Sequence, residues 1–508
     1  MKRLHPIMLA GTGSDVGKSI LATALCRIFL QDGYHPAPFK AQNMALNSFA
    51  TPEGLEIGRA QAVQAEAAGI PCHTDMNPLL LKPQSDHTSQ VVLHGIPIGN
   101  RDAYDFWHKD PFKSTIHPVT PAPPPIDFPQ EVHSAFDRLT QRYNPIVMEG
   151  AGSIAEINLR DHDLVNMPMA QHAHADVILV GDIDRGGVFA SVYGSIALQT
   201  PEDKKLIKGI IINKFRGDLR LFEDGRKMLE ELCGVPVLGV VPYYKDIHID
   251  EEDSVALERK AGGQLSTVNS QLSTVSVAVV LLRHLSNFTD FNVLECDPRV
   301  HLFYTNNTED LLKSDIIIIP GSKSTLSDLY ELRRNGVAQA IIRAHRQGAT
   351  VMGICGGYQM MGVEVCDPHH VEGEIDRLPG LGLLPTITTM SGEKVTRQVT
   401  CEYGCGYEIH MGETRPLHAA PSPLLHLNDG TEDGYFVDDH CMGTYVHGIL
   451  DNPSFIEKLL APFKDKMAQT AQTFDYTAFK EEQYDKLAAH VRQHLNMDLL
   501  YQILSDND

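Results

Sequence analysis

The chain is poor in the features that mark secreted, membrane-spanning or nucleic-acid-binding proteins. Its nine cysteines are scattered and odd in number, which excludes the disulfide framework of a small secreted domain. No apolar run approaches the length that crosses a bilayer. Basic residues are outnumbered, and the net charge of −22 argues against nonspecific nucleic-acid binding. These absences predict a reduced, soluble, cytoplasmic protein without a membrane or nucleic-acid partner.

What the chain does have is enough length and apolar content for more than one core. It contains 508 residues, of which 43% are hydrophobic and 21% charged, a composition typical of globular proteins. Apolar strands alternate with helices in both halves, which favours parallel α/β sheets. A polar stretch rich in glycine and serine separates the halves. We predict a first domain over 1–250, a linker over 251–274, a second domain over 275–455 and a helical extension over 456–508.

A glycine-rich loop near the N-terminus has the pattern of a phosphate-binding loop. A short apolar strand at 7–10 precedes it, and an apolar helix at 20–30 follows it. Backbone N–H groups of such a loop face phosphate oxygens, while a lysine adds charge and a hydroxyl ligates Mg²⁺. The spacing from Gly11 to Gly17 is one residue longer than in the common motif, so a chance glycine-rich turn is the alternative. The candidate nucleotide-binding residues are Thr12, Gly13, Ser14, Asp15, Gly17, Lys18 and Ser19.

Charged side chains follow the next expected strands. Ligands bind at the carboxyl ends of strands in open α/β sheets, so Lys40 and Glu149 are placed to meet a phosphate and a Mg²⁺ ion. Arg185 could hold a carboxylate or phosphate through its planar fork of donors. The alternatives are a solvated lysine, a helix cap or solvated turn at Glu149, and an arginine that pairs with Asp182 or Asp184.

Two further stretches of the first half carry structural predictions only. The residues 42–44 and 56–61 are expected to lie in a helical region of small side chains. The region 107–129 is rich in proline, which excludes a helix or a central strand. We interpret it as a surface loop or an insertion without catalytic residues.

The second half is organised around Cys355. A short apolar strand at 349–354 ends at this cysteine, and two glycines and a helical segment follow. This is the pattern of a nucleophile elbow, in which small neighbours permit a strained turn that lifts the nucleophile above the sheet. A buried structural cysteine is the alternative, because a free thiol also behaves as a small hydrophobic group. The candidate base and oxyanion loop elsewhere in this half favour the elbow.

The candidate base follows Cys355 in the sequence, and the candidate oxyanion loop precedes it. His447, between a β-like Tyr-Val pair and a glycine, is a candidate general base for the thiol, although a lone histidine is more often structural. Gly321 and Ser322 follow a strand at 315–319 in a turn that can aim N–H groups at an acyl oxyanion, together with the N–H of Gly356.

The assembled motifs resemble the cobyric acid synthase family, which comprises glutamine-dependent corrinoid amidases. The resemblance covers nearly the whole chain outside the proline-rich region and the C-terminal tail. In the first half the motifs that carry it are Gly11–Ser19, Phe39–Met44, Glu149–Ser153, Asp182–Phe189 and Asn213–Asp218. In the second half they are Pro320–Lys323, Gly353–Gln359 and Tyr445–Gly448.

The resemblance implies an α/β fold with two parts. The first is a P-loop domain similar to dethiobiotin synthetase, with a doubly wound parallel sheet, and the second is a class I glutamine amidotransferase domain. It also implies ATP, Mg²⁺ and L-glutamine as reactants or cofactors, with Lys40 near the transferred phosphoryl group, Glu149 on Mg²⁺ and Asn213 near the adenine. Gln359 is expected to help bind glutamine.

The activity that the resemblance implies is the amidation of the b, d, e and g side-chain carboxylates of adenosylcobyrinic acid a,c-diamide. One alternative is cobyrinic acid a,c-diamide synthase, and another is a partitioning-type ATPase switch with a dead amidotransferase domain. Class I domains usually have a glutamate two residues after the histidine, where this chain has Ile449. The third member of the triad is therefore open, and so is a homo-oligomeric state.

Overall fold

The structure is a computed structural model that describes residues 2–83, 88–102, 126–244, 246–250, 274–418, 422–467 and 474–505. It divides into two compact units. The first comprises Met1–Ala45, Ile57–Ile249 and Phe479–Asp508, and the second comprises Leu46–Glu56 and Asp250–Ala478. Most of the proline-rich region and of the expected linker lies outside the described residues. The exclusion of a helix is wrong at the end of the proline-rich region, because Phe128 and Pro129 open helix α4 (Phe128–Thr140), where a proline in the first turn removes no helical hydrogen bond. None of the described helices is long and apolar enough to cross a membrane.

The first unit is built on a six-stranded parallel sheet in the order β12-β11-β10-β1-β9-β2. The strands are β1 (Ile7–Gly11), β2 (Ala37–Phe39), β9 (Ile146–Glu149), β10 (Asp176–Asp182), β11 (Ile207–Phe215) and β12 (Val237–Pro242). Every residue of β1, β9 and β10 is buried, which explains why these strands read as continuous apolar runs. The predicted parallel α/β sheet is confirmed.

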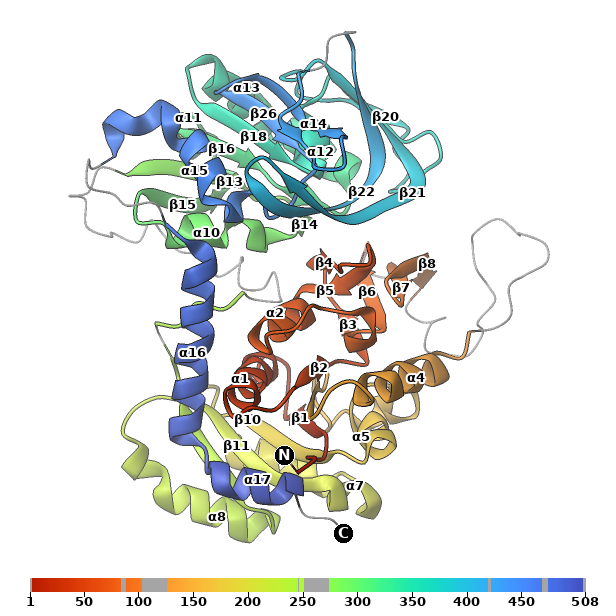
Figure 1. Cartoon of the computed structure of the whole chain (residues 1–508), viewed down its shortest axis with the longest axis vertical. Coiled ribbons are helices and arrows are strands. Elements are labelled where there is room, and N and C mark those ends of the chain that lie inside the picture. The colour runs from red at the N-terminus through yellow and green to blue at the C-terminus, as the bar shows by residue number, and fades with distance from the viewer. Residues whose placement is uncertain are drawn as a thin grey trace. The chain divides into compact units, whose positions relative to one another are not determined.

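Helices cover both faces of this sheet. Figure 1 shows α1 and α2 on one side of β1 and β2, and α4 and α5 on the other. The helices are α1 (Lys18–Gln31), α2 (Arg59–Ala67), α4 (Phe128–Thr140), α5 (Met167–Ala173), α6 (Val188–Ala197), α7 (Pro201–Leu206) and α8 (Glu223–Cys233). The chain passes from β1 past β9 to β2 and later fills the other side of β1 with β10. The loop after β1 therefore lies at the switch point of the sheet, where such folds bind ligands.

The helix expected over 42–44 and 56–61 is wrong for 42–44 and for 56–58, and is confirmed only from Arg59. The residues Gln42–Met44 form β3, which pairs in parallel with β6 (Leu79–Pro83), and β7 (Thr88–Leu93) and β8 (Ile96–Asp102) complete a small second sheet. The residues Glu56–Gly58 form β5, and helix α2 begins only at Arg59. Long-range pairing with β6 overrides the local preference of the small residues.

The C-terminal helices return to the first unit. Helix α16 (Tyr476–His494) and helix α17 (Met497–Ser505) bury Leu487, Val491 and Leu500. The backbone N–H of Asn496 donates to the carbonyl of Leu238 on β12 at 2.8 Å. The tail from Phe479 therefore completes the edge of the first sheet.

The second unit has its own six-stranded sheet in the order β15-β13-β16-β18-β26-β25, in which only β25 is antiparallel. The strands are β13 (Val275–Val280), β15 (Val300–Thr305), β16 (Ile316–Ile319), β18 (Thr350–Ile354), β25 (Tyr435–Asp438) and β26 (Cys441–Thr444). The helices are α10 (Asn292–Cys296), α11 (Thr308–Lys313), α12 (Thr325–Arg334), α13 (Val337–Arg346), α14 (Gly356–Met361) and α15 (Pro453–Leu460). Strand β18 lies in the middle of this sheet, so its carboxyl end is enclosed by neighbours.

A second sheet packs beside the first in this unit, in the order β20-β19-β21-β22. Its strands are β19 (Glu364–Cys366), β20 (Arg377–Pro379), β21 (Thr386–Cys401) and β22 (Gly404–Pro416). Figure 1 shows β21 and β22 as a long curved pair. Strand β4 (Ser48–Ala50) belongs to the same unit and contacts both of them, although it comes from the first fifty residues of the chain.

Candidate active sites

The loop between β1 and α1 is folded tightly around its glycines. Asp15 and Gly17 have positive φ angles of 56° and 97°, which curl the backbone before the helix begins at Lys18. A Cβ atom at Gly17 would lie 2.2 Å from the side-chain nitrogen of Asn213. The expected strand, loop and helix are therefore present, and the N-terminus of α1 follows the loop directly, which is the arrangement that binds phosphate in such folds.

Lys18 spans this loop. Its Nζ atom donates to the carbonyls of Gly13 and Gly152, each at 3.1 Å, and its side chain is buried. The lysine thus bridges the loop after β1 and the loop after β9. An ammonium group held in this position supplies positive charge to a phosphate loop.

Glu149, at the end of β9, is the centre of a buried polar cluster. Ser19 Oγ and Lys40 Nζ donate to its Oε1 atom at 2.8 and 3.0 Å, and Gln64 Nε2 donates to Oε2 at 2.8 Å. Burial alone would raise the pKa of Glu149, but the charge of Lys40 and these three hydrogen bonds outweigh burial and lower it. The structure therefore brings together the predicted residues Ser19, Lys40 and Glu149.

Gln64 is a member of this cluster that the sequence did not reveal. It lies on α2, the helix of small residues, and its amide has no motif around it that distinguishes it from a surface glutamine. Only the packing of α2 against α1 brings it to Glu149. Its side chain is buried, which an isolated glutamine on a solvated helix face would not be.

Asn213 and Arg185 differ in their surroundings. Asn213, two residues before the end of β11, is buried and donates to the carbonyl of Val16 at 2.9 Å, while its Oδ1 atom accepts no hydrogen bond from the described residues. Arg185 is 57% exposed and pairs with Asp15 at 3.1 Å and with Asp182 at 3.8 Å. The pairing with Asp182 matches the structural alternative for Arg185, and the contact with Asp15 places it at the phosphate loop.

Cys355 lies at the strained turn that the elbow pattern predicts. Its φ and ψ angles are 52° and −112°, a conformation that non-glycine residues rarely adopt. A Cβ atom at Gly357 would lie 1.9 Å from the carbonyl oxygen of Ile319, and one at Gly353 would lie 2.6 Å from the N–H of Tyr358. The glycines are needed because the turn packs directly against backbone.

His447 is held by a carboxylate that comes from a distant part of the sequence. Its Nδ1 atom lies 2.7 Å from Oδ2 of Asp290, whose Oδ1 atom accepts from the N–H of Gly448 at 3.1 Å. Asp290 lies on the short helix η4 (Phe288–Phe291), and the two side chains are 1% and 4% exposed. Asp290, which no motif indicated, therefore lies where a third triad member would hold the imidazole, a role that the sequence left open at Ile449.

The charges around the imidazole set its protonation. Burial alone would lower the pKa of His447, but the charge of Asp290, the neighbouring Cys355 and the hydrogen bond with Asp290 outweigh burial and raise the pKa to about 10. The Cys355 Sγ atom lies 3.6 Å from the carbonyl oxygen of Ile409, and His447 Nε2 makes no hydrogen bond within the described part of the chain. Nε2 is thus available to exchange a proton with the thiol or with a leaving group.

The predicted oxyanion loop lies against the elbow. The residues Gly321–Ser322 form β17, which pairs with β14 (Leu285–Ser286). The N–H nitrogen of Ser322 lies 2.8 Å from where a Cβ atom at Gly356 would stand, and a Cβ atom at Gly321 would lie 3.2 Å from the His447 ring. Ser322 Oγ donates to Asp328 at 2.7 Å, which fixes the loop.

Gln359, one helical turn after Cys355, makes hydrogen bonds to neighbouring elements. Its Oε1 atom accepts from Thr325 Oγ1 at 3.1 Å, and its Nε2 atom donates to the carbonyl of Met411 at 2.8 Å and to the Tyr445 hydroxyl at 3.2 Å. These bonds hold α14 against β22, so that the Cys355 thiol faces that strand. Contact of Gln359 with glutamine stays a prediction.

Two family models match the chain over most of its length. A model described as a CobQ/CobB/MinD/ParA nucleotide binding domain matches residues 7–255. A model described as a CobB/CobQ-like glutamine amidotransferase domain matches residues 276–455. Fold, site and matches together define a protein that joins a nucleotide-binding domain to a glutamine amidotransferase domain.

Curated proteins named cobyric acid synthase are similar to the chain from end to end. That of Bacteroides fragilis is 73% identical over 517 residues and that of Phocaeicola vulgatus 69% over 517, with 100% of both chains covered in each case. That of Parabacteroides distasonis is 55% identical over 509 residues, covering 98% of this chain and 99% of its own. The chain belongs to the cobyric acid synthase family, and the family prediction made from the motifs is confirmed.

Proposed function

We propose that this protein catalyses the ATP- and glutamine-dependent amidation of the b, d, e and g side-chain carboxylates of adenosylcobyrinic acid a,c-diamide, giving adenosylcobyric acid. The observation that carries the proposal is the triad of Cys355, His447 and Asp290 in one chain with the Glu149 cluster at a phosphate loop. A nitrogen-releasing site and a carboxylate-activating site are the two parts that such a ligase needs. Membership of the cobyric acid synthase family supports the choice of acceptor.

In the second unit the residues support hydrolysis of glutamine through a thioester. The Cys355 sulfur attacks the side-chain carbonyl, and the N–H groups of Ser322 and Gly356 stabilise the oxyanion that develops. His447, held by Asp290, protonates the departing ammonia and then activates the water that releases glutamate.

In the first unit the residues support transfer of a phosphoryl group from ATP to a carboxylate. A carboxylate at neutral pH is a poor electrophile, so it needs activation as an acyl phosphate before ammonia can attack it. Lys18 and Lys40 offset the negative charge that develops, and the curled backbone of the loop holds the phosphates in place. Arg185, at the mouth of the loop, is suited to the carboxylate of the incoming side chain.

The polar side chains around the phosphate loop also suit Mg²⁺ and adenine. A low pKa keeps Glu149 ionised beside the Ser19 hydroxyl, and these two oxygens are the ligand types that Mg²⁺ prefers. Mg²⁺ held there would neutralise phosphate charge during transfer. The buried Oδ1 atom of Asn213, which lacks a donor among the described residues, suits the amino group of adenine. No group of three His, Cys, Asp or Glu side chains within the described ranges suits a metal held by protein ligands alone.

Two other functions were compatible with the motifs. Cobyrinic acid a,c-diamide synthase would share this chemistry and differ in the carboxylates it amidates. A partitioning-type ATPase switch would need a dead amidotransferase domain, and the missing glutamate at Ile449 was its main support. Asp290 in contact with His447 removes that support.

The direct test is mass spectrometry of corrinoids incubated with the full-length protein, ATP, Mg²⁺ and glutamine. Four successive hydroxyl-to-amino replacements on adenosylcobyrinic acid a,c-diamide are expected, whereas replacements on cobyrinic acid itself at the a and c positions would favour the diamide synthase. No replacement on either corrinoid would refute the proposal.

The division of labour between the units is tested by Cys355→Ala. This variant should abolish glutamine-supported amidation and leave ammonium-supported amidation at the wild-type rate, because only the second unit uses the thiol. Cys441→Ala, at a buried cysteine on β26, is the matched control and should retain both activities. Loss of ammonium-supported amidation in Cys355→Ala would contradict the division.

A further inference from the structure

One short segment of the chain leaves the first unit and returns to it. The residues Leu46–Glu56 belong to the second unit, whereas the chain on either side, up to Ala45 and from Ile57, belongs to the first. The segment contains β4 and turns back to begin β5. A connection of this kind means that one continuous piece of backbone is built into both units.

Both ends of the excursion are tied to the Glu149 cluster of the first unit. Lys40, which precedes the segment, and Gln64, which follows it, each donate to the Glu149 carboxylate. The buried amide of Asn77 joins the two ends, because its Nδ2 atom donates to the carbonyl of Lys40 at 3.0 Å and its Oδ1 atom accepts from the N–H of Gly58 at 3.2 Å. A change in the hydrogen-bond partners of Glu149 therefore acts on both ends of the segment.

The start of the segment makes hydrogen bonds to the beginning of helix η4, which carries Asp290. Within the second unit, Asn47 Oδ1 accepts from the N–H of Phe288 at 3.3 Å, and the N–H of Ser48 donates to Asn287 Oδ1 at 3.0 Å. Asn287 has a positive φ of 54° and precedes helix η4. The segment thus fixes the turn from which Asp290 reaches the imidazole.

The middle of the segment contacts strand β22, which carries Tyr407, a neighbour of His447. The Phe49 ring lies 4.6 Å from the Tyr407 ring, between centroids. Tyr407 on β22 exchanges two backbone hydrogen bonds with His447, at 3.0 and 2.8 Å, and its ring stacks on the imidazole at 5.3 Å. Phe49 therefore supports the residue that covers the catalytic imidazole.

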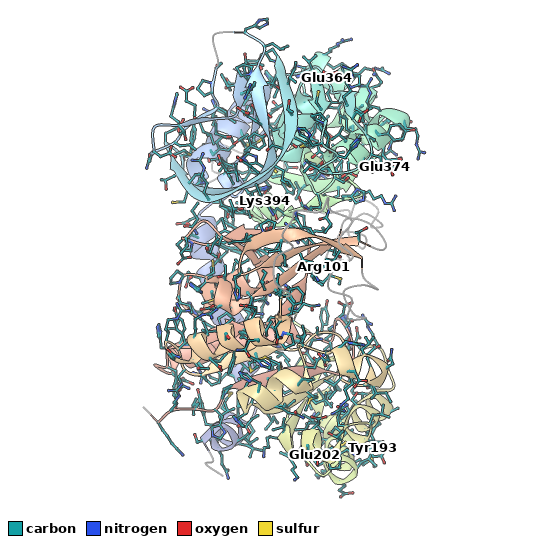
Figure 2. The ribbon with its side chains drawn as sticks, turned by 90° about the vertical axis from the view of Figure 1, so that its right-hand side faces the viewer. Arg101, Tyr193, Glu202, Glu364, Glu374 and Lys394 are labelled. Atoms are coloured by element: carbon teal, nitrogen blue, oxygen red, sulfur yellow. The ribbon has the colours of Figure 1, made fainter. Side chains whose placement is uncertain are left out.

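The end of the segment is anchored by a buried ion pair. The Lys394 ammonium donates to the Glu56 carboxylate, and both side chains are buried. Figure 2 labels Lys394, which comes from β21. The side-chain amide of Gln398 on the same strand donates to the carbonyl of Ala50 at 3.0 Å. The segment is therefore attached to η4, β22 and β21 at the same time.

We propose that residues 46–56 are a positioning element that couples ligand binding at the phosphate loop to the alignment of His447 and Asp290 with Cys355. The proposal rests on the two-site function proposed above. When ligands rearrange the partners of Glu149, Lys40 and Gln64 shift, and the segment transmits the shift to both supports of the imidazole. A displacement of about 1 Å at a catalytic group is enough to change turnover by about 10²-fold.

The test compares Glu56→Gln with Glu53→Gln in the full-length protein. Both changes remove one negative charge from the segment without changing its shape, but Glu56 is buried against Lys394 and Glu53 is exposed. Phe49→Leu tests the ring contact separately. Glutamate release is measured with and without ATP and adenosylcobyrinic acid a,c-diamide, and ammonium-supported amidation is measured in parallel.

In the wild type, ATP and the corrinoid should stimulate glutamate release. Glu56→Gln and Phe49→Leu should lose most of that stimulation, about tenfold in kcat with little change in KM for glutamine, and retain ammonium-supported amidation. Glu53→Gln should behave as the wild type. Lys394→Met should produce the same loss and add nothing to Glu56→Gln in the double variant, because the two side chains act as one pair.

Three results would overturn the proposal. The first is a wild type whose glutamate release does not respond to ATP and the corrinoid. The second is a loss by the same factor with and without these ligands, which indicates support of the fold alone. The third is wild-type stimulation in both Glu56→Gln and Phe49→Leu. A failure of the proposed function is distinct, since the wild type would then amidate no corrinoid even with ammonium.

Discussion

Replacement of Asp290 by asparagine tests the charge that the imidazole faces. The substitution keeps the size of the side chain and leaves a carbonyl oxygen that can still accept from the N–H of Gly448. It removes the negative charge 2.7 Å from His447 Nδ1. It also introduces an amide NH₂ group, which can donate to Nδ1 and so favour the tautomer in which Nε2 carries the proton.

The size of the effect follows from the pKa of His447. Its rise from 6.5 to about 10 corresponds to about 5 kcal/mol in favour of the imidazolium. Asp290 and Cys355 share this effect, Asp290 first, against the opposing effect of burial. Asp290 makes the largest favourable contribution, so its loss costs at least half of this net effect, about 2–3 kcal/mol or more, when the imidazole takes a proton, and the wrong tautomer adds to that. We therefore expect glutaminase kcat to fall by about 10²-fold or more.

The assay is glutamate release by the full-length protein, with ammonium-supported amidation as the internal reference. Asp290→Asn should lower the rate of glutamate release and leave the rate of ammonium-supported amidation unchanged. Asp137→Asn is the matched control, because Asp137 also contacts a histidine, His172 at 3.0 Å, but lies on α4 of the first unit. If Asp290→Asn retains glutaminase kcat within about threefold of the wild type, the orienting role of Asp290 is wrong.

Two further predictions concern the fold around the triad. Gly357→Ala would place a Cβ atom 1.9 Å from the Ile319 carbonyl oxygen. We therefore expect the free energy of unfolding to fall by about 3 kcal/mol or more, with a lower Tm by calorimetry. The control is Gly392→Ala, which has open space around it and should have the Tm of the wild type. Asp433 accepts hydrogen bonds from Thr444 and Tyr445, just before His447, and burial raises its pKa from 3.8 to about 7. Because the folded state binds this proton more tightly than the unfolded state, the contribution of Asp433 to stability is full below pH 3.8 and is lost as the pH rises through about 7. Asp433→Asn cannot ionise, so its Tm should fall less than that of the wild type between about pH 5 and about pH 8, and an equal fall would show that Asp433 is not the group responsible.

Much of this protein was determined by short stretches of its sequence. The glycine loop before Lys18 and the turn around Cys355 were predictable, because a tight turn leaves glycines at fixed positions next to the residue it presents. The buried strands of both sheets were predictable as well, because a parallel strand covered on both faces is apolar along its whole length. Family membership followed from these motifs and from their order in the chain.

Local patterns failed where a residue acquires its role from a distant partner. Asp290 is one acidic residue in a short apolar stretch, and it meets His447 only because η4 packs against the turn that follows β26. Gln64 has no sequence signature for the same reason. The strand β3 was taken for helix because its pairing partner β6 is far along the chain.

Tertiary structure alone also decided which pieces of chain belong together. The segment 46–56 joins the second unit and the tail from Phe479 joins the first, against the order of the sequence. Composition cannot reveal such exchanges, because Phe49 or Leu487 is apolar in any core that it fills. The sequence therefore determined which chemical groups are present and the turns that expose them. Long-range packing decided which group orients which, since the free energy of those contacts depends on neighbours that no local window contains.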